Sequence, residues 1–588
     1  MHPSGTLSAS SAASTGSRTR VAAPAATSLT PTSKLAGADL PASSVPPANT
    51  TATTTATTTP GQDVEYNTYA VASYAVGLQP QDWDIHSASA APWYLTLEQV
   101  LAQVWPSAFD VGADGAPMLD TSLLNSATEV SSDPQIVVYQ INPRAVWSDG
   151  RAITYVDFAY NWQAQSGKTA FSDLAGKTYT PLDESGYDDI ARVSGAPSGP
   201  YTVTVTFSHP YPDWQSLFSY LMPAHVGRAV GFDSGFTDPV ADLVSGGPYL
   251  VSELQDGYSL ELVRNAQYWG SPANLSTITY YFMSGAAETI NALSAGDVDV
   301  ASLEAGPPTS FKQLQATSGL SVEAVASNFY EDLDFNERDG PLSSPVLREA
   351  VMMALDRSGM ASEVLGPYGL ATTTVDNRVY LRGQPGYAPD GASYDQAAPA
   401  AAVKLLEAKG YTLKGNVLRS PAGSPVQLSL FVQQADPVAQ ELAPLVASSL
   451  LAIGVTVTPT PGGPPNADMF DEPSALPPGW QMAIELRQVP LYPSQVARSY
   501  ATGGATNLDG YSSAAMNALA NEIRSVVPAE LPALYGEIDD QAWKDFVDIP
   551  LVQVPVVLAR DSSLLNVEPG PYFGDIAWDE QDWGFRAP

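Results

Sequence analysis

The residues that most often carry catalytic or metal chemistry are scarce and badly spaced in this sequence. Two GKT triplets begin at Gly167 and Gly176, but a phosphate-binding P-loop needs a glycine five residues earlier, where the chain has Trp162 and Phe171. The four histidines lie far apart and form no HExxH pair. The chain has no cysteine, so disulfides, thiolate metal sites and a cysteine nucleophile are excluded. We therefore expect neither an enzyme nor a bound metal or cofactor.

Acidic and aromatic residues are abundant instead. The chain has 62 acidic and 26 basic residues, a formal net charge of −36, which argues against the basic surface that nucleic acid or anionic lipid requires. Acidic pairs such as Asp188-Asp189 and Asp539-Asp540 arise by chance at this content, and we interpret them as solvated. Tryptophans and tyrosines near predicted strand ends suit a ligand-binding cleft; the alternative is that most of them are core residues.

The beginning of the sequence has a different composition from the rest. Residues 1–61 are rich in Ser, Thr, Ala and Pro, and such a tract buries too little apolar surface to fold, so we predict a disordered linker. No apolar run is long enough for a transmembrane helix. No charged segment followed by an apolar core is visible either, so the sequence shows no signal peptide. This leaves a cytoplasmic protein, or a true start upstream of Met1.

After the linker, strand-like and helix-like segments alternate, which predicts a mixed α/β fold. Tyr201–Phe207 reads YTVTVTF, the strict alternation of a strand. Tyr249–Leu254 and Ser259–Val263 are strand-like segments joined by Gln-Asp-Gly, a hairpin signal. Thr154 with Asp157 predicts a capping box at the start of a helix.

The stretch Phe329–Arg357 combines both periods. Apolar Leu333 and Phe335 alternate with aspartates, which is the pattern of a half-buried strand. Ser344-Pro345 then predicts an N-cap and a first-turn proline. The apolar residues that follow lie on one helical face, with Arg348 pointing away from it.

Several stretches, in this order, resemble the extracytoplasmic solute-binding proteins of peptide-type ABC transporters, the family of dipeptide, oligopeptide and nickel binding proteins (family 5). The main ones are WSDGRAITYVDFAYNW (147–162), GGPYLVSELQDGYSLELVRNAQYWG (246–270), INALSAGDVDVA (290–301), DFNERDGPLSSPVLREAVMMALDR (334–357) and YDQAAPAAAVKLLEAKGY (394–411). The resemblance covers roughly residues 62–588.

This resemblance implies an α/β fold: a two-lobe periplasmic-binding-protein clamp of type II, cluster C, with mixed sheets and a first lobe split into two subdomains. The chain would cross between the lobes near residues 326–333 and 552–560. The expected parts are lobe I at 62–329 (subdomain Ia at 62–81 and 241–329, subdomain Ib at 82–240), lobe II at 330–556, and a return to lobe I at 557–588.

The resemblance also implies a function. We expect the solute-binding component of an ABC importer, which captures a peptide or peptide-like solute between its lobes and delivers it to a membrane permease. Some actinobacterial cell-wall lipoproteins use this fold without transport, so a scaffold or regulatory lipoprotein is the alternative. The protein would be a monomer outside the cytoplasm, membrane-anchored or at the cell surface, with no nucleic-acid partner. Its gene start would then be placed downstream of a signal sequence.

One departure from the family affects the ligand. Peptide-binding members commonly hold the ligand's α-ammonium with an aspartate after the strand near Trp480, but residues 485–496 read ELRQVPLYPSQV. Either Glu485 takes this role, or the ligand has no free amino end, or Glu485 and Arg487 simply pair with each other. The ligand contacts expected from the family arrangement are Tyr74, Trp93, Tyr330, Asn336, Trp480, Glu485, Arg487 and Tyr492.

Overall fold

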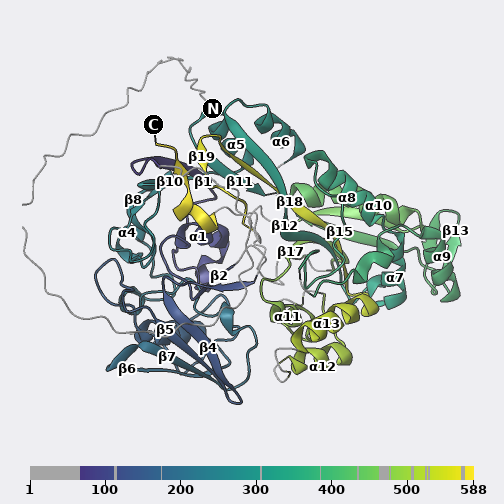
Figure 1. Cartoon of the computed structure of the whole chain (residues 1–588). Coiled ribbons are helices and arrows are strands. Elements are labelled where there is room, and N and C mark those ends of the chain that lie inside the picture. The colour runs from purple at the N-terminus through teal and green to yellow at the C-terminus, as the bar shows by residue number, and fades with distance from the viewer. Residues whose placement is uncertain are drawn as a thin grey trace, which may run out of the picture. The chain divides into compact units, whose positions relative to one another are not determined.

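A mixed sheet of ten strands runs through the described part of the chain, in the order β16-β15-β17-β12-β18-β11-β1-β10-β9-β8 (Figure 1). The computed structural model describes residues 66–587 apart from gaps at 112–115, 174, 305–306, 385, 434–435, 463–475, 477–478, 505–506, 508, 524–525, 527–529 and 571–576. The linker predicted at residues 1–61 lies outside the described residues.

The ten strands pair in both directions, since β1 is parallel to β10 and β11, while β12 is antiparallel to β17 and β18. Their bounds are β1 (Val71–Val76), β8 (Tyr249–Gln255), β9 (Ser259–Arg264), β10 (Thr277–Phe282), β11 (Val300–Glu304), β12 (Leu320–Phe335), β15 (Gln427–Gln433), β16 (Thr456–Gly462), β17 (Met482–Gln488) and β18 (Asp548–Asp561). The hairpin predicted from Gln-Asp-Gly is confirmed, because β8 and β9 pair around that turn.

A second sheet of four antiparallel strands has the order β4-β5-β7-β6. Its strands are β4 (Leu124–Ser132), β5 (Gln135–Ile141), β6 (Ile190–Ala196) and β7 (Gly199–Phe207). Along β7, Val203, Val205 and Phe207 are buried and the threonines between them are not, so the predicted alternation is confirmed. Within the described residues there are also three two-stranded sheets, formed by β2 (Phe109–Val111) with β3 (Pro117–Leu119), β13 (Thr412–Lys414) with β14 (Val417–Arg419), and β19 (Leu564–Leu565) with β20 (Gly584–Phe585).

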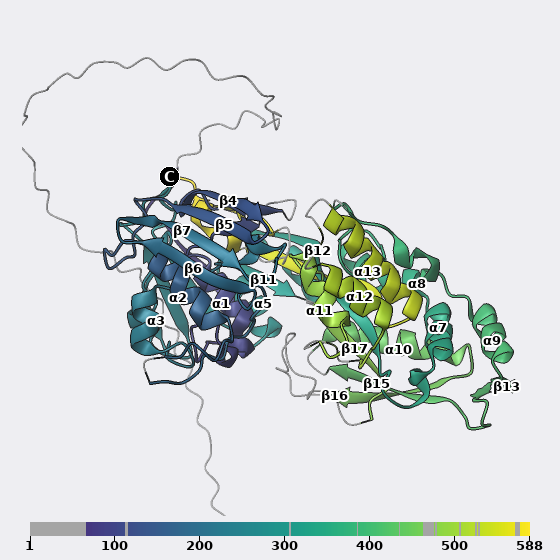
Figure 2. The same cartoon turned by 90° about the horizontal axis from the view of Figure 1, so that it is seen from below.

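Helices cover the sheets in two groups, and Figure 2 shows α2 beside β6 and β7. The first group is α1 (Tyr94–Leu101), α2 (Tyr155–Gln165), α3 (Ala224–Val230), α4 (Pro239–Asp242), α5 (Ala286–Ala295) and α6 (Pro308–Gln315). The second group is α7 (Pro345–Ala354), α8 (Arg357–Leu365), α9 (Pro399–Ala408), α10 (Pro437–Leu451), α11 (Val496–Tyr500), α12 (Ala514–Glu522) and α13 (Leu531–Asp545).

Two helix starts were predicted from capping patterns. The capping box at Thr154 and Asp157 is present at the start of α2, with the Thr154 N–H donating to the Asp157 carboxylate at 2.9 Å. Helix α7 begins at Pro345 after Ser344, as predicted, but the Ser344 side chain makes no capping hydrogen bond. The first-turn proline and the buried face of α7 are therefore sufficient to begin this helix.

The apolar side chains form two large clusters, which define two lobes. One cluster gathers residues of β1–β10 and α1–α3 together with Trp583, and we call the elements β1–β11 and α1–α6 the first lobe. The other gathers residues of α7–α10 and β15–β17, and we call the elements α7–α13 and β13–β17 the second lobe. Strands β12 and β18 pair along both lobes, with a register irregularity between Ala326 and Tyr330. The two predicted crossings between the lobes, near residues 326–333 and 552–560, fall within β12 and β18. The domain boundaries expected from the sequence stay predictions.

Two expectations about Phe329–Arg357 were wrong, for the same reason. Strand β12 is not half-buried, because Asp332 and Asp334 are fully buried, like Leu333 on the opposite face. Arg348 does not point into solvent, because its guanidinium donates to the carbonyls of Leu342, Asp545 and Phe546 at 2.8–2.9 Å. The last two carbonyls belong to the end of α13, where an arginine satisfies groups that have no helical partner. Each charged side chain is buried because a distant segment supplies its partner.

Candidate ligand-binding site

The pairing of β12 with β17 brings three of the predicted contact residues together. Tyr330 lies opposite Arg487, and Asp332 lies opposite Glu485. Residues directly opposite in an antiparallel pair point to the same face of the sheet. This face therefore carries an aromatic ring, a guanidinium and several carboxyl groups next to the register irregularity of β12.

Arg487 pairs with aspartates on β12 rather than with Glu485. Its Nη2 donates to Asp334, and its Nε lies 3.0 Å from Asp332 Oδ2. The second contact brings the charges close without the alignment of a hydrogen bond. The Arg487 side chain keeps 18% exposure, whereas both aspartates have none. The two buried aspartates therefore hold the guanidinium in place, while part of the Arg487 side chain stays accessible to solvent.

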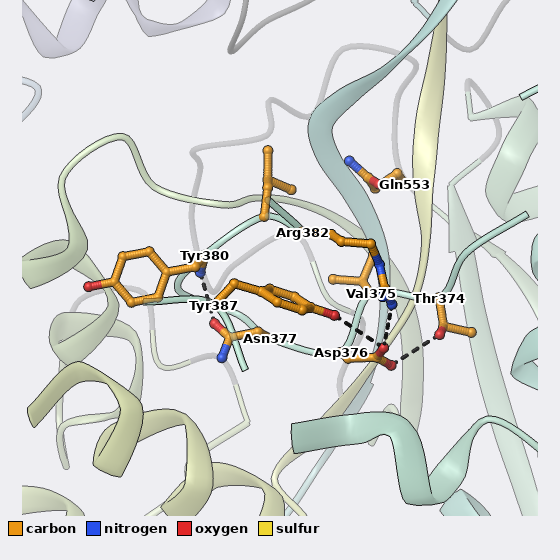
Figure 3. Close-up of a pocket in the computed structure, with 9 residues that line it drawn as sticks. Thr374, Val375, Asp376, Asn377, Tyr380, Arg382, Tyr387 and Gln553 are labelled. Carbon is orange, nitrogen blue, oxygen red and sulfur yellow. Dashed lines mark hydrogen bonds and ion pairs between the residues drawn. The ribbon is translucent and has the colours of Figure 1, made fainter. Parts of the chain in front are cut away.

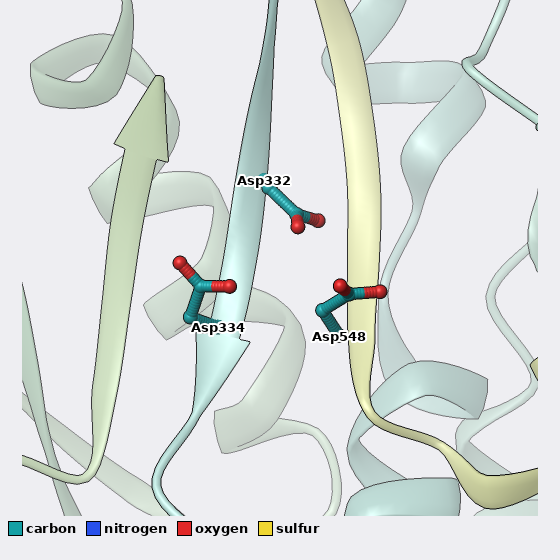
Figure 4. A group of neighbouring side chains, drawn as sticks. All are labelled: Asp332, Asp334 and Asp548. Atoms are coloured by element: carbon teal, nitrogen blue, oxygen red, sulfur yellow. The ribbon is translucent and has the colours of Figure 1, made fainter. Parts of the chain in front are cut away.

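Three carboxylates, those of Asp332, Asp334 and Asp548, come together on β12 and β18 (Figure 4). One oxygen from each lies within 4.8 Å of the others, a geometry that suits a hard cation. Each of the three carboxylates faces a guanidinium, since Arg378 Nε contacts Asp548 Oδ1 at 2.5 Å and Arg487 contacts the other two. The three carboxylates and the two arginines therefore form a buried ion network.

Glu485 is set apart from that network. Burial, followed by the charge of Asp334, raises the pKa of Glu485 to about 8, against the lowering effect of Arg487. Burial, followed by Asp436, also raises the pKa of Glu331 on the neighbouring strand. A positive group placed beside these carboxyls would favour their ionised forms. The arrangement is thus compatible with Glu485 receiving a ligand cation, which stays a prediction.

The other predicted residues occupy three separate places. Asn336 Nδ2 donates to the Trp480 carbonyl at 2.8 Å, and both side chains are buried at the far end of the β12–β17 pair.

Tyr74 is fully buried in β1, with its ring 5.6 Å from Tyr280 in the core of the first lobe. Trp93 ends a short 3-10 helix (Ala88–Trp93) and packs half-buried against the same core. The structure does not bring Tyr74 or Trp93 together with the β12–β17 group.

Tyr492 lies where the second lobe meets the first. Its hydroxyl donates to the Gln215 carbonyl at 3.2 Å, and the Ser494 N–H donates to Asp213 Oδ2 at 2.9 Å. Burial raises the pKa of Asp213, and the charges of Asp213 and Asp110 add to burial in raising the pKa of Tyr492. These two carboxyls of the first lobe therefore lie near Tyr492 of the second. Sequence reasoning missed Asp110 and Asp213, which no motif marks.

A small pocket beside Tyr330 was also missed. It is lined by Thr374, Val375, Asp376, Asn377, Tyr380, Leu381, Arg382, Tyr387 and Gln553 (Figure 3). Gln553 lies opposite Tyr330 in the β12–β18 pair, and Thr374 forms a bridge with Val552. The loop 374–387 is therefore attached to the strands that join the lobes. No sequence signal identified it, because its residues are brought to β18 only by the fold.

The two-lobe α/β arrangement, with paired strands shared by both lobes and polar side chains where they meet, defines a solute-binding protein. The sequence matches the family described as "Bacterial extracellular solute-binding proteins, family 5 Middle" over residues 101–492, and the chain belongs to this family. The family resemblance and the two-lobe fold expected from the sequence are confirmed.

Similar proteins agree with this assignment. The oligopeptide-binding protein OppA of Mycobacterium tuberculosis is 28% identical over 484 residues, covering 78% of this chain and 76% of that protein. The probable monoacyl phosphatidylinositol tetramannoside-binding protein LpqW of M. tuberculosis is 29% identical over 310 residues, 52% of this chain and 46% of that protein. The solved structure of the periplasmic EDTA-binding protein EppA has a TM-score of 0.80 and 26% identity, covering 89% of this chain and 98% of that one.

These relatives are binding proteins and not enzymes, which confirms the expectation of a binding protein. The family description points to a location outside the cytoplasm. Among the helices of the described residues, none is long and apolar enough to cross a membrane.

Proposed function

We propose that this chain is the solute-binding component of an ABC importer, and that it captures a peptide or peptide-like solute between its lobes for delivery to a membrane permease. The observation that carries the proposal is the similarity to OppA over 484 residues. We further propose that the protein acts as a monomer at the outer side of the cell membrane, anchored there or held at the cell surface.

The geometry supports a clamp. Within the described residues, Tyr492 and Ser494 of the second lobe make polar contacts with Gln215 and Asp213 of the first. A ligand bound between the lobes stabilises whichever arrangement gives it contacts from both sides, and the free energy comes from that difference in affinity. Tyr330, Glu485 and Arg487 would line the second-lobe wall, with Asp110 and Asp213 opposite.

Calorimetric titration with a mixture of unmodified tri-, tetra- and pentapeptides tests the function. The wild-type protein should bind the mixture. Tyr492→Phe, which removes one hydrogen bond between the lobes, should weaken binding by about two- to tenfold. Tyr258→Phe is the matched control, because Tyr258 is 57% exposed on the β8–β9 turn, and its affinity should equal that of the wild type. Failure of the wild-type protein to bind any of these peptides would overturn the peptide-binding role.

A scaffold or regulatory lipoprotein of the cell envelope is the second candidate. The similarity to LpqW, whose name describes binding to a mannosylated phosphatidylinositol, favours it. Titration with a phosphatidylinositol mannoside in detergent micelles separates the two candidates. Binding of this lipid together with no response to the peptide mixture would favour the scaffold, and the reverse result would favour import.

A further inference from the structure

We propose that Asp332, Asp334 and Asp548 form a binding site for one calcium ion between β12 and β18, the strands that join the lobes. All three side chains are fully buried. The ion would therefore be a fixed part of the fold, whereas a captured solute would lie between the lobes. This inference does not depend on the proposed function.

The strand register places the three carboxylates on one face of the sheet. Asp334 lies directly opposite Asp548 in the antiparallel pair, and Asp332 is two residues before Asp334 on the same strand. Like charges directly opposite each other destabilise a strand pair. Figure 4 shows the Asp332 carboxylate extending from β12 toward Asp548 on β18. Sequence motifs did not indicate this group, because only the pairing of two distant strands brings it together.

The arginines of the network leave several carboxylate oxygens without a partner. Among the described residues, Asp332 Oδ1 and Asp334 Oδ2 are buried and accept no hydrogen bond. Asp332 Oδ2 accepts none either, although Arg487 Nε lies 3.0 Å away. A buried polar atom without a partner costs free energy. Asp332 is thus a fully buried carboxylate, directed into the group, whose lone pairs are free to bind a cation.

The charges of the network do not balance either. Two guanidinium groups, those of Arg378 and Arg487, form ion pairs with four buried carboxylates, which belong to Asp332, Asp334, Asp539 and Asp548. If all four carboxylates are ionised, two negative charges remain, which one divalent cation would compensate. The alternative is that the carboxyls take up protons. A cation satisfies several of the unpartnered oxygens at once, whereas a proton neutralises one carboxyl only.

The donor atoms favour calcium over softer metals. Zinc, copper and nickel favour histidine or cysteine ligands, and the group contains neither. Calcium takes oxygen ligands at about 2.3–2.6 Å, so two ligand oxygens of one ion lie up to about 5 Å apart. The three carboxylate oxygens lie within 4.8 Å of one another, which agrees with this size. The Tyr500 hydroxyl donates to Asp548 Oδ2 at 2.6 Å and orients that carboxylate.

The strand pair is irregular at the same place. Asp332 lies opposite Pro550, which has no N–H to donate to β12, and the register shifts between Glu331 and Asp332. The backbone ladder is therefore interrupted beside the three carboxylates. An ion bound by Asp332 and Asp334 of one strand and by Asp548 of the other would connect the strands where the ladder does not.

Metal content and melting temperature of the full-length protein test the site. The protein is unfolded in urea, freed of metal with a solid chelating resin, and refolded with or without an excess of calcium chloride. A soluble chelator is avoided, because the relative EppA binds EDTA. After gel filtration, elemental mass spectrometry should find about one calcium ion per chain. Calcium at about 100 times its Kd should raise the melting temperature by about 2–3 °C.

Asp332→Asn keeps the size of the side chain and removes its charge. The variant should hold no calcium and should melt at the same temperature with and without the ion. Because it also relieves repulsion among the carboxylates, it should be at least as stable as the calcium-free wild type. Asp334→Asn, the second ligand variant, should lose the calcium response as well.

Asp84→Asn is the matched control, since Asp84 of the first lobe is also fully buried and also has an oxygen without a hydrogen-bond partner among the described residues. It should keep the calcium ion and the rise in melting temperature. A rise that persists in Asp332→Asn would come from calcium on the acidic surface and would overturn the proposal. Refolded wild type that holds no calcium would show that protons neutralise the network, which would overturn it too.

Discussion

The first lobe buries tryptophans at its centre, whereas the second lobe buries arginines. Among the described residues, Trp83, Trp105, Trp147 and Trp583 are the largest fully buried side chains, and all belong to the first cluster. Arg357 and Arg378 come next, and both lie in the second lobe. The two interiors therefore depend on different interactions, dispersion and apolar burial in one and charge pairing in the other.

Buried carboxylates show the same difference. In the first lobe, Asp157 accepts from the backbone N–H groups of Thr154 and Ala224 at 2.9 and 3.0 Å. In the second lobe, Arg378 contacts Asp539 at 3.2 Å and Asp548 at 2.5 Å. Asp157 is thus held by backbone N–H groups, whereas Asp539 and Asp548 share one cation, Arg378, with further hydrogen bonds from Trp543 and Tyr500. The second lobe should consequently be more sensitive to loss of one charged residue.

The largest effect is expected for Arg378→Ala. This change leaves Asp539 and Asp548 without their guanidinium and removes a cation 4.1 Å from the Trp543 ring centre. We expect a loss of about 4–5 kcal/mol in the free energy of unfolding at neutral pH, measured by urea denaturation. The loss should shrink at pH 5, because burial raises the pKa of Asp539 to about 7 and this carboxyl then takes up a proton. A loss below about 1 kcal/mol, as measured for solvent-exposed ion pairs, would contradict the inference that the second lobe depends on buried charge pairing.

A smaller effect, with no dependence on pH, is expected for Leu97→Ala in the first lobe. Leu97 is fully buried in α1 among the aromatic residues of the first cluster. Removing its side chain should cost about 3 kcal/mol through lost burial and the cavity left behind. The same urea experiment at pH 5 and pH 8 should give equal losses, because no titrating group is involved. A clear pH dependence would show that the two interiors are not as different as we infer.

The smallest effect is expected for Glu485→Gln. The pKa of Glu485 is raised to about 8 in the folded protein, from an ordinary value of 4.5. The folded state therefore binds this proton more tightly, and the resulting stability is lost as the pH rises from about 4.5 to 8. Glu485→Gln should raise the melting temperature at pH 8 by about 1–2 °C and leave it unchanged at pH 4.5. Glu323→Gln, at an exposed position of β12, should change neither value.

Local patterns predicted the elements well, because their causes are local. The alternation of Tyr201–Phe207 and the capping box at Thr154 depend on neighbouring residues only, and both are present in the structure. Family resemblance predicted the two-lobe fold. The register that brings Tyr330 opposite Arg487 could not be derived from the sequence, because it depends on strands far apart in the chain.

The candidate site was harder to predict, because its charged residues find distant partners. Arg378 contacts Asp539 and Asp548, which lie 161 and 170 positions later in the chain. Asp539 was interpreted as a solvated residue of an acidic pair, yet it is fully buried. Arg382 carries no motif at all, and only its exposure beside Asp376 and Tyr387 draws attention to it. The composition shows an excess of acidic residues, but it does not show which carboxylates are paired with an arginine.

The strand pair β12–β18 has a further consequence for how the protein is made. Ser327 on β12 donates to the Val554 carbonyl on β18, and the two residues are 227 positions apart in the chain. During synthesis, β12 leaves the ribosome long before its partner strand β18 has been translated. Because β18 lies between β12 and β11, the ten-stranded sheet cannot be completed until then. Contacts of such long range slow folding and expose unpaired strand edges meanwhile. We expect the nascent chain to stay incompletely folded, and dependent on chaperones, until nearly all of it has been synthesised.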